Sequence, residues 1–371
     1  MKARVVVDII FEMIFIHKHH IMNRDLKIEN ILLNSKCMKP ESKDRPSFEE
    51  ILIEMRKKLL LTLTIPNYIK FIEPFAFCDC PKLRTVEISP ESELQTIGKK
   101  AFADTSIEKF TISPHITKIC KGSFRFCIDL QTFEIPNNSI LKTIEKDAFK
   151  DLPIERFTIP SSCTNLEEGW RSGTKKLKKI ELSLDNPIYK KYEDKMIIKK
   201  SNEEEENYDV LVFCERDIEK VTIPIFIKKI DSFAFQYCER LKEVEILPNS
   251  DLEIIDIHAF NRSSIEKFTV PPHLTLICEG AFSNSKICMF EIPENSELKT
   301  IEKEAFTNSS IESFTFSPHI TQISESLFQY CGNIQSIQFQ ECFFQIHRLD
   351  SLKYRQISLN FKKDGAKKHH I

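Results

Sequence analysis

One column of residues constrains the fold of this 371-residue chain more than any other feature. The pattern [Leu/Ile]-x-x-[apolar]-x-[apolar] occurs twelve times, and the residue between its last two apolar positions alternates between Thr and an acid or amide. In chain order this column reads Thr64, Glu87, Thr111, Glu134, Thr158, Glu181, Thr222, Glu245, Thr269, Glu291, Thr315 and Gln338. Equivalent residues of parallel, in-register strands stack about 4.8 Å apart, where like charges repel. The alternation therefore predicts a stack of parallel strands in sequence order.

The spacing of these strands indicates the fold class. Val86, Phe110 and Phe133 hold the same place in three successive copies of the pattern. Their even spacing falls within the period of roughly 20–29 residues that, with an L-x-x-L-x-L core, is typical of leucine-rich repeats. In such repeats each unit buries its apolar side against its neighbours. We therefore predict a leucine-rich-repeat solenoid of the α/β class, rich in β-structure, with about twelve short parallel strands on its concave face.

Charged residues flank the alternating column. The position two residues before each Thr is a cation in four repeats, at Lys109, Arg156, Lys220 and Lys267. Each cation is expected within diagonal reach of Glu on neighbouring strands, so the exposed face would be a lattice of ion pairs. One interpretation is that this lattice only stabilises the solenoid; the other is that it binds a protein or glycan. The candidate partner-binding residues are Lys109, Arg156, Lys179, Lys220, Glu243, Glu245, Lys267, Met289 and Glu291, and Glu243 and Met289 depart from the regular columns.

Six of the twelve cysteines hold recurrent places in the repeat. Four of them lie three residues after a repeated Phe, at Cys80, Cys127, Cys238 and Cys331. Equivalent positions of a solenoid point the same way into the core, where free Cys behaves as a small hydrophobe. Cys78-x-Cys80 has neither the spacing nor a His partner of a zinc site. We expect core thiols, no metal and no cofactor.

One interval is longer than the others. The step from Ile180 to Val221 is nearly twice the usual repeat, although Glu181 and Thr222 keep the alternation. The extra residues are predicted to leave the convex side of one repeat as a hairpin insertion at about 187–217. Two apolar segments, 196–198 and 210–213, flank an acidic tip at 201–207. The tip is either a solvated loop or a projection that binds a partner.

The repeats resemble the BspA-like leucine-rich-repeat family, whose units read approximately A-F-x-x-C-x-x-L-x-x-[IV]-x-I-P. Residues 76–88 and 234–246 match this pattern, and the resemblance covers about residues 60–340. It implies a non-enzymatic interaction or adhesion scaffold, since family members are largely adhesion or host-interaction proteins at the cell surface.

The segment 1–58 resembles a different family. Residues 21–33 resemble the catalytic loop of eukaryotic protein kinases, with Asn23 where that family usually carries His. This resemblance gives Asp25 the role of the base, Lys27 a place near the transferred phosphate and Asn30 a magnesium ligand. Residues 37–52 resemble the end of the kinase C-lobe.

The segments that a kinase needs between and before these two are absent. The chain has no D-F-G, no activation segment, no Gly-rich loop and no β3 lysine, so phosphoryl transfer is not expected. We predict that residues 1–58 are a truncated kinase-like fragment serving as a helical N-terminal cap of the solenoid at 59–340. The alternative function is a fragment of a protein kinase with leucine-rich repeats, active in a full-length form. Residues 341–371 are predicted to be a C-terminal cap and basic tail.

Net charge and the distribution of apolar residues limit the kinds of partner and the location that the sequence predicts. The formal net charge of −2 gives no argument for nucleic acid as a partner. No segment is apolar for long enough to span a membrane, and Asp8 and Glu12 interrupt the only stretch similar to a signal peptide. As written, the sequence predicts a cytoplasmic monomer, and the family resemblance leaves the cell surface open.

Overall fold

The computed structural model describes residues 60–320, 322–324 and 326–339. Every regular element within these ranges is a β-strand, and no helix occurs there. The proposed helical cap at 1–58, including Asp25, Lys27 and Asn30, lies outside the described residues, as does the proposed tail at 341–371.

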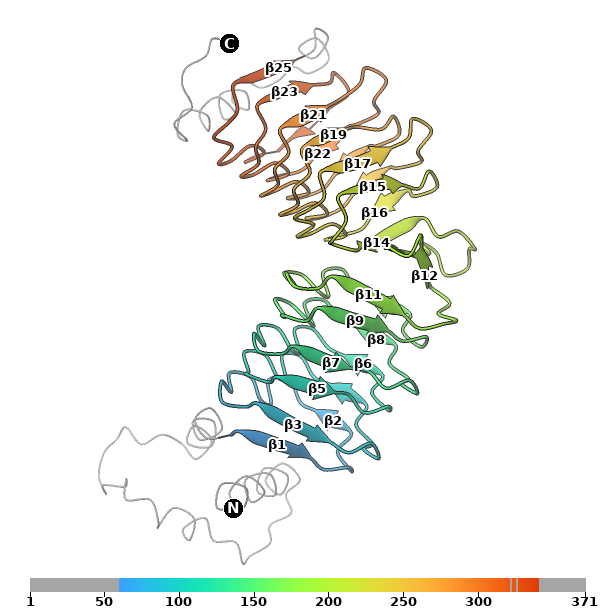
Figure 1. Cartoon of the computed structure of the whole chain (residues 1–371), viewed down its shortest axis with the longest axis vertical. Coiled ribbons are helices and arrows are strands. Elements are labelled where there is room, and N and C mark those ends of the chain that lie inside the picture. Colours follow the sequence, from blue (N-terminus) through green and yellow to red (C-terminus); the bar gives the residue numbers. More distant parts are fainter. Residues whose placement is uncertain (1–59, 321, 325, 340–371) are drawn as a thin grey trace, which may run out of the picture.

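The chain folds into a β-solenoid whose turns follow one another along a curved path (Figure 1). Each turn carries one longer strand, and these longer strands lie on the near side of the molecule in Figure 1. Among the described residues, these long strands are β1 (Thr62–Ile65), β3 (Thr85–Ile88), β5 (Lys109–Thr111), β7 (Thr132–Glu134), β9 (Arg156–Ile159), β11 (Lys179–Leu182), β15 (Lys220–Ile223), β17 (Glu243–Ile246), β19 (Lys267–Thr269), β21 (Met289–Glu291), β23 (Ser313–Phe316) and β25 (Ser336–Phe339). The prediction of about twelve short parallel strands is confirmed.

The register of the long strands agrees with the alternating column. Thr64 lies opposite Glu87, Thr111 opposite Glu134, and all pairs between these strands are parallel. The same partnership of a Thr with the acid or amide of the following strand occurs at Thr158–Glu181, Thr222–Glu245, Thr269–Glu291 and Thr315–Gln338. Apolar residues on both sides of each column point inward, which is why the period-two pattern selects a strand.

A second layer of two-residue parallel strands closes each turn. The first half of the solenoid carries β2 (Phe71–Ile72), β4 (Thr96–Ile97), β6 (Lys118–Ile119), β8 (Thr143–Ile144) and β10 (Asn165–Leu166). The second half carries β16 (Lys229–Ile230), β18 (Ile254–Ile255), β20 (Leu276–Ile277), β22 (Thr300–Ile301) and β24 (Gln322–Ile323). Between the two layers lies the core, into which the long strands, the short strands and the Ala-Phe turns all place side chains.

Phenylalanine fills this core in two interleaved stacks. The Phe of the Ala-Phe turns stack on one another, with ring centroids 5.5 Å apart for Phe102–Phe124 and 5.1 Å for Phe260–Phe282. Phe from the long strands inserts edge-on between them, as Phe110 does against Phe124 at 4.7 Å. Edge-to-face and offset-stacked rings are the favoured geometries. Most of the phenylalanines between residues 60 and 339 thus serve one packing task repeated along the solenoid.

The cysteines of the Phe turns are buried. Cys80, Cys127, Cys238 and Cys331 all lie within the core. Burial raises the pKa of Cys127 and of Cys238 to about 12, so these thiols stay protonated. Their role in the described structure is packing.

The long interval contains the antiparallel hairpin that the sequence indicated, with the acidic tip exposed, but the place of this hairpin in the solenoid differs from our expectation. It forms β12 (Tyr189–Tyr192), β13 (Met196–Lys199) and β14 (Val210–Cys214), which pair antiparallel in this order. β14 also pairs in parallel with β16 of the second layer. Ile197 and Val212 pack into the core of the first half, whereas Ile198 and Leu211 pack into that of the second half.

The strands of the interval are therefore a partition between the two halves of the core and not a loop that leaves the convex side. Only the tip, at about residues 201–207, is exposed throughout. The physical reason is composition: Val210–Cys214 is an unbroken apolar run, which is typical of a strand buried on both faces.

Two buried arginines secure this junction. Arg171 donates to the backbone oxygens of Val212, at 3.0 Å, and of Phe233, at 3.3 Å, and its guanidinium lies over the Phe213 ring. Arg216 donates to the backbone oxygen of Thr174. Burial lowers the pKa of Arg171 to about 9 and of Arg216 to about 10. These side chains bridge segments on opposite sides of the partition.

Candidate functional site

The exposed face of the long strands, which we call the charged face, consists of the first and third residues of each long strand. In β5 and β7 its basic unit, which we call a clamp, is a carboxylate held by a lysine and a threonine of the preceding strand; here the carboxylate is that of Glu134. Lys109 Nζ lies 2.6 Å from Glu134 Oε1, and Thr111 Oγ1 donates to Oε2 at 2.7 Å. The hydrogen bonds from Lys109 and Thr111 lower the pKa of Glu134 below its ordinary value. One strand thus supplies both a cation and a hydroxyl to the carboxylate of the next strand.

The second half of the solenoid repeats the clamp. Lys267 Nζ lies 2.9 Å from Glu291 Oε1, and Thr269 Oγ1 donates to Oε2 at 3.0 Å. The pKa of Glu291 is lowered by these same two partners. In β15 and β17, Thr222 donates to Glu245 at 3.0 Å.

Where an acid replaces the expected residue, the clamp spreads over two carboxylates. Lys220 contacts Glu243 at 2.9 Å and Glu245 at 3.5 Å, because Glu243 takes the place two residues before Glu245. The hydrogen bond to Glu243, followed by the charges of both acids, raises the pKa of Lys220.

The clamp is weaker at the end of the first half. Glu181 Oε1 forms an ion pair with Lys179 Nζ of its own strand at 2.8 Å, and the guanidinium of Arg156 on the preceding strand lies 4.0 Å from the same oxygen. The structure therefore brings eight of the nine candidate residues into ion pairs on one face. The ninth is Met289.

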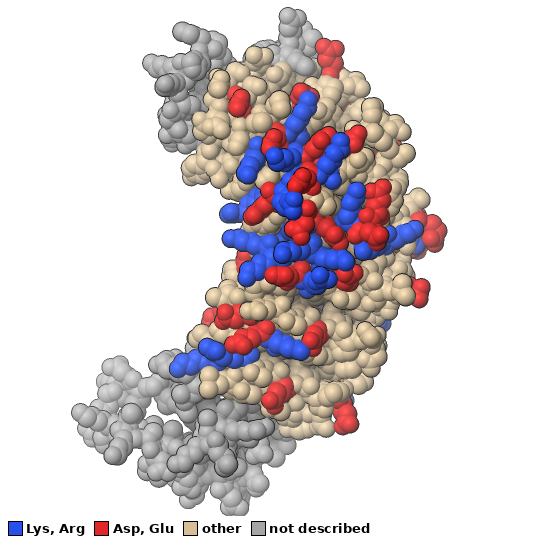
Figure 2. Space-filling view, in the orientation of Figure 1, with Lys and Arg blue, Asp and Glu red and all other residues tan. Residues whose placement is uncertain are grey.

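Met289 breaks the polar surface. It lies opposite Lys267 in the register and is 51% exposed. The first and third positions of the other described long strands hold only Thr, Ser, Gln and charged residues. Figure 2 shows Lys and Arg interspersed with Asp and Glu over the middle of this side of the molecule. Met289 is thus an exposed apolar side chain within an array of paired charges.

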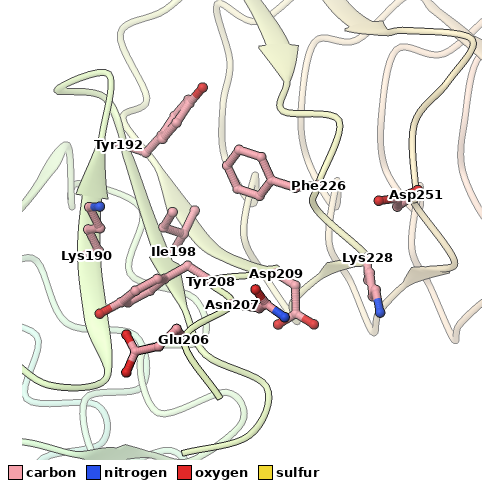
Figure 3. A pocket seen from close by; sticks show the side chains of 10 residues that line it. All are labelled: Lys190, Tyr192, Ile198, Glu206, Asn207, Tyr208, Asp209, Phe226, Lys228 and Asp251. Atoms are coloured by element: carbon pink, nitrogen blue, oxygen red, sulfur yellow. The ribbon is translucent and has the colours of Figure 1, made fainter.

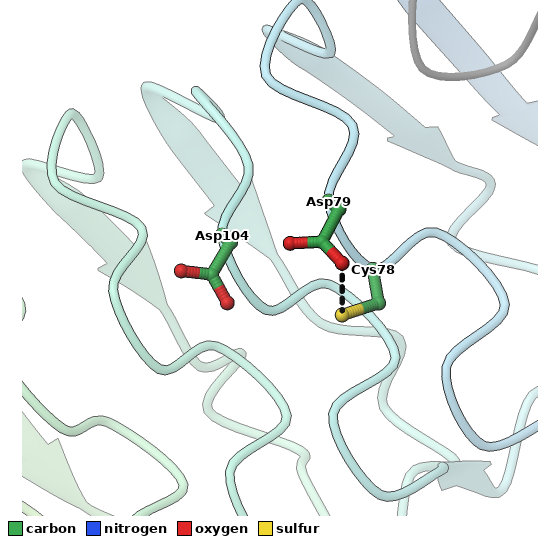
Figure 4. A group of neighbouring side chains, drawn as sticks. All are labelled: Cys78, Asp79 and Asp104. Atoms are coloured by element: carbon green, nitrogen blue, oxygen red, sulfur yellow. Dashed lines mark hydrogen bonds between the residues drawn. The ribbon is translucent and has the colours of Figure 1, made fainter. Parts of the chain in front are cut away.

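One group of side chains elsewhere has the composition of a metal site. Ligand atoms of Cys78, Asp79 and Asp104 lie within 4.8 Å of one another (Figure 4). The Cys78 thiol contacts Asp79 Oδ2 at 3.6 Å, and burial, followed by the Asp79 charge, raises the pKa of this thiol. A protonated thiol is a poor ligand.

The backbone explains why these two acids lie there. Asp79 has φ 56° and Asp104 has φ 59°, and both occupy the second place after a Phe of the Ala-Phe turns. This left-handed conformation favours Asp and Asn. Successive turns place equivalent residues side by side, so the group follows from the repeat.

A pocket beside the partition was missed by the sequence reasoning. Its lining comes from β12, β13 and the segments that precede β14, β16 and β18, and it includes Tyr192, Tyr208 and Phe226 (Figure 3). Tyr192 and Tyr208 lie in the long interval, outside the repeat columns, whereas Phe226 stands where other repeats carry His115, His273 and His319. The position of these three aromatic residues in or next to the long interval was the only signal that the sequence offered.

The comparisons with known proteins agree with the geometry. A model described as "BspA type Leucine rich repeat region", in six copies, matches residues 55–178 and 209–335. The chain belongs to the BspA-type leucine-rich-repeat family. The unmatched residues 179–208 contain β12 and β13 of the partition, which depart from the repeat of this family. The comparisons give no support to the kinase resemblance of the first residues.

Solved structures show the same fold. A pneumococcal vaccine antigen, PcpA, is 20% identical, with a TM-score of 0.57 over 75% of this chain and 62% of that one, so this chain spans less than two thirds of the antigen. A leucine-rich cell surface protein from Faecalibacterium prausnitzii is 18% identical, with a TM-score of 0.52 over 85% and 84%. A leucine-rich-repeat protein from Eubacterium ventriosum is 18% identical, with a TM-score of 0.50 over 75% and 78%.

A search of curated proteins found no match. Within the described residues, no helix has the length and apolar character needed to cross a membrane.

Proposed function

We propose that this BspA-type protein is a non-enzymatic interaction scaffold that binds a protein or glycan through the charged face of its long strands. Two proteins of the same fold, a vaccine antigen and a cell surface protein, support an interaction role of this kind. A monomer suffices for such a role, and the cytoplasmic location stays a prediction.

The observation that carries the proposal is the exposed Met289 within this face. Protein interfaces combine apolar anchors, among which Met is enriched, with a polar rim. Here the rim is supplied by Lys267, Glu291 and Glu243. We therefore centre the proposed binding surface on β17 to β21.

The test compares two charge insertions of the same kind. Met289→Lys places a cation at the proposed anchor, whereas Ile128→Lys places one at an exposed apolar residue away from the long strands (Ile128 is 68% exposed). Both variants and the parent protein are immobilised and exposed to protein extracts and to a glycan array, and bound partners are identified by mass spectrometry or by array position.

A partner that is retained by the parent and by Ile128→Lys, but lost from Met289→Lys, would support the proposal. If every partner of the parent binds both variants equally, the charged face is not the binding surface. In that case the ion pairs serve only the stability of the solenoid.

A further inference from the structure

We propose that the pocket beside the partition is a second binding site, and that its ligand is a neutral carbohydrate of one or two pyranose rings. The pocket has a volume of about 480 Å³, within the range of roughly 300–1,000 Å³ that is usual for small-ligand sites. It lies at the long interval, away from the charged face, so this inference does not rest on the proposed function.

Aromatic rings form one side of the pocket. Tyr192 of β12 and Phe226 meet edge to face, with ring centroids 5.6 Å apart. The ring of Tyr208, just before β14, faces the Lys190 Nζ at 5.5 Å (Figure 3). Phe226 is 38% exposed although it is a large apolar side chain. The negative face of such a ring attracts the C–H groups of a sugar as it attracts other positive edges.

Polar groups with free hydrogen-bonding capacity complete the lining. Among the described residues, no ion pair or side-chain hydrogen bond occupies the Lys228 ammonium, the Asp251 carboxylate or the Asn207 amide. The charged face differs in this respect, because its cations are paired. Ammonium groups donate, carboxylates accept and amides do both, which is the set that the hydroxyl groups of a sugar require.

Two further acids that line the pocket already have partners within the protein. Asp209 accepts from the Ser201 amide at 3.0 Å and from its hydroxyl at 2.9 Å, and Glu206 pairs with Lys200 at 3.5 Å. These bonds hold the turn between β13 and β14 in place. The free groups of the pocket therefore carry both signs of charge, which favours a neutral polyhydroxylated ligand over a phosphate or a cation.

The experiment measures binding of lactose, maltose, mannobiose and chitobiose to the full chain by saturation-transfer NMR and calorimetry. We expect saturable binding of at least one disaccharide with a Kd below about 10 mM. Phe226→Ala removes one ring and should weaken that binding roughly 3- to 10-fold. Asp251→Asn keeps the shape of the side chain and should also weaken it.

Phe71→Ala is the matched control, because Phe71 is a 58% exposed ring in a short strand of the second layer that does not line the pocket. Its affinity should equal that of the parent, and melting curves should show that all variants fold. The proposal is overturned if no disaccharide binds saturably, or if Phe71→Ala weakens binding as much as Phe226→Ala. Loss of binding in Met289→Lys with full binding in Phe226→Ala would also overturn it, because the sugar would then lie on the charged face.

Discussion

The Thr111 hydroxyl donates a hydrogen bond of 2.7 Å to the Glu134 carboxylate on the following strand. The bond has a direction along the chain, since Thr64, Thr222 and Thr269 also donate to the Glu of the strand that follows. The sequence predicts that each cation lies between Glu residues on both neighbouring strands. Lys109 and Lys267 instead join Thr on the same strand in holding the following Glu. The charged face is therefore built from two-strand units.

These units make stability depend on pH. The pKa values of Glu134 and Glu291 are lowered in the folded protein from an ordinary 4.5, chiefly by hydrogen bonds from Lys109 and Lys267. A carboxylate with a lowered folded pKa stabilises the fold fully above its unfolded pKa, and this contribution is lost as the pH falls through the folded value. We expect the melting temperature to fall below about pH 5, and to fall less in a Glu134→Gln, Glu291→Gln variant. Glu239→Gln, an exposed control, should leave the pH profile unchanged.

Reversing one charge of a unit should destabilise it, and reversing both should restore it. Lys267 and Glu291 are each about half exposed in their ion pair. Lys267→Glu should therefore lower the free energy of unfolding by about 0.2–1 kcal/mol, with the additional Glu291→Lys change recovering part of the loss. Urea titrations measure both values. Equal effects of Lys267→Glu and of Lys286→Glu, which reverses an exposed lysine outside the charged face, would show that the pair contributes nothing.

The Phe stacks should carry far more stability than the ion pairs. Phe282 is fully buried and contacts four other rings, including Phe260 and Phe306. Phe282→Ala should cost about 3–5 kcal/mol, because it removes the ring and leaves a cavity between neighbouring turns. Phe71→Ala, at an exposed ring, should cost less than about 0.5 kcal/mol. Chemical denaturation of the two variants compares them directly.

The repeat could be read from the sequence because its parts recur. Thr111 and Glu134 are one repeat apart, and the same spacing along the chain predicts that they lie on adjacent strands, as they do. The partition could not be placed in this way, since it occurs once. The unbroken apolar run Val210–Cys214 does indicate a strand that is buried on both faces. A hairpin on the convex side could bury only one face, so this run was the signal against that placement.

The pocket was beyond sequence reasoning for a different reason. Tyr192, Phe226 and Asp251 come from three separate stretches of the chain and share no motif. Only the antiparallel pairing of β12, β13 and β14 brings β12 close to the segments that precede β16 and β18. The Met289 anchor was visible, because it interrupts a regular column, and its function stays a prediction.

The junction between the two halves should depend on Arg171. This side chain is 2% exposed, and its guanidinium satisfies the backbone oxygens of Val212 and Phe233. Arg171→Ala removes the donor from the buried oxygen of Val212 and the part-buried oxygen of Phe233, and an unsatisfied buried group costs about 1–3 kcal/mol. The core is already divided into two clusters at this point, so the loss should also weaken their coupling. We expect calorimetry to show one unfolding transition in the parent and two in the variant. Lys175→Ala, an exposed neighbour, serves as the control; a single transition in both variants, lowered only in Arg171→Ala, would assign Arg171 to stability without a role in joining the two halves.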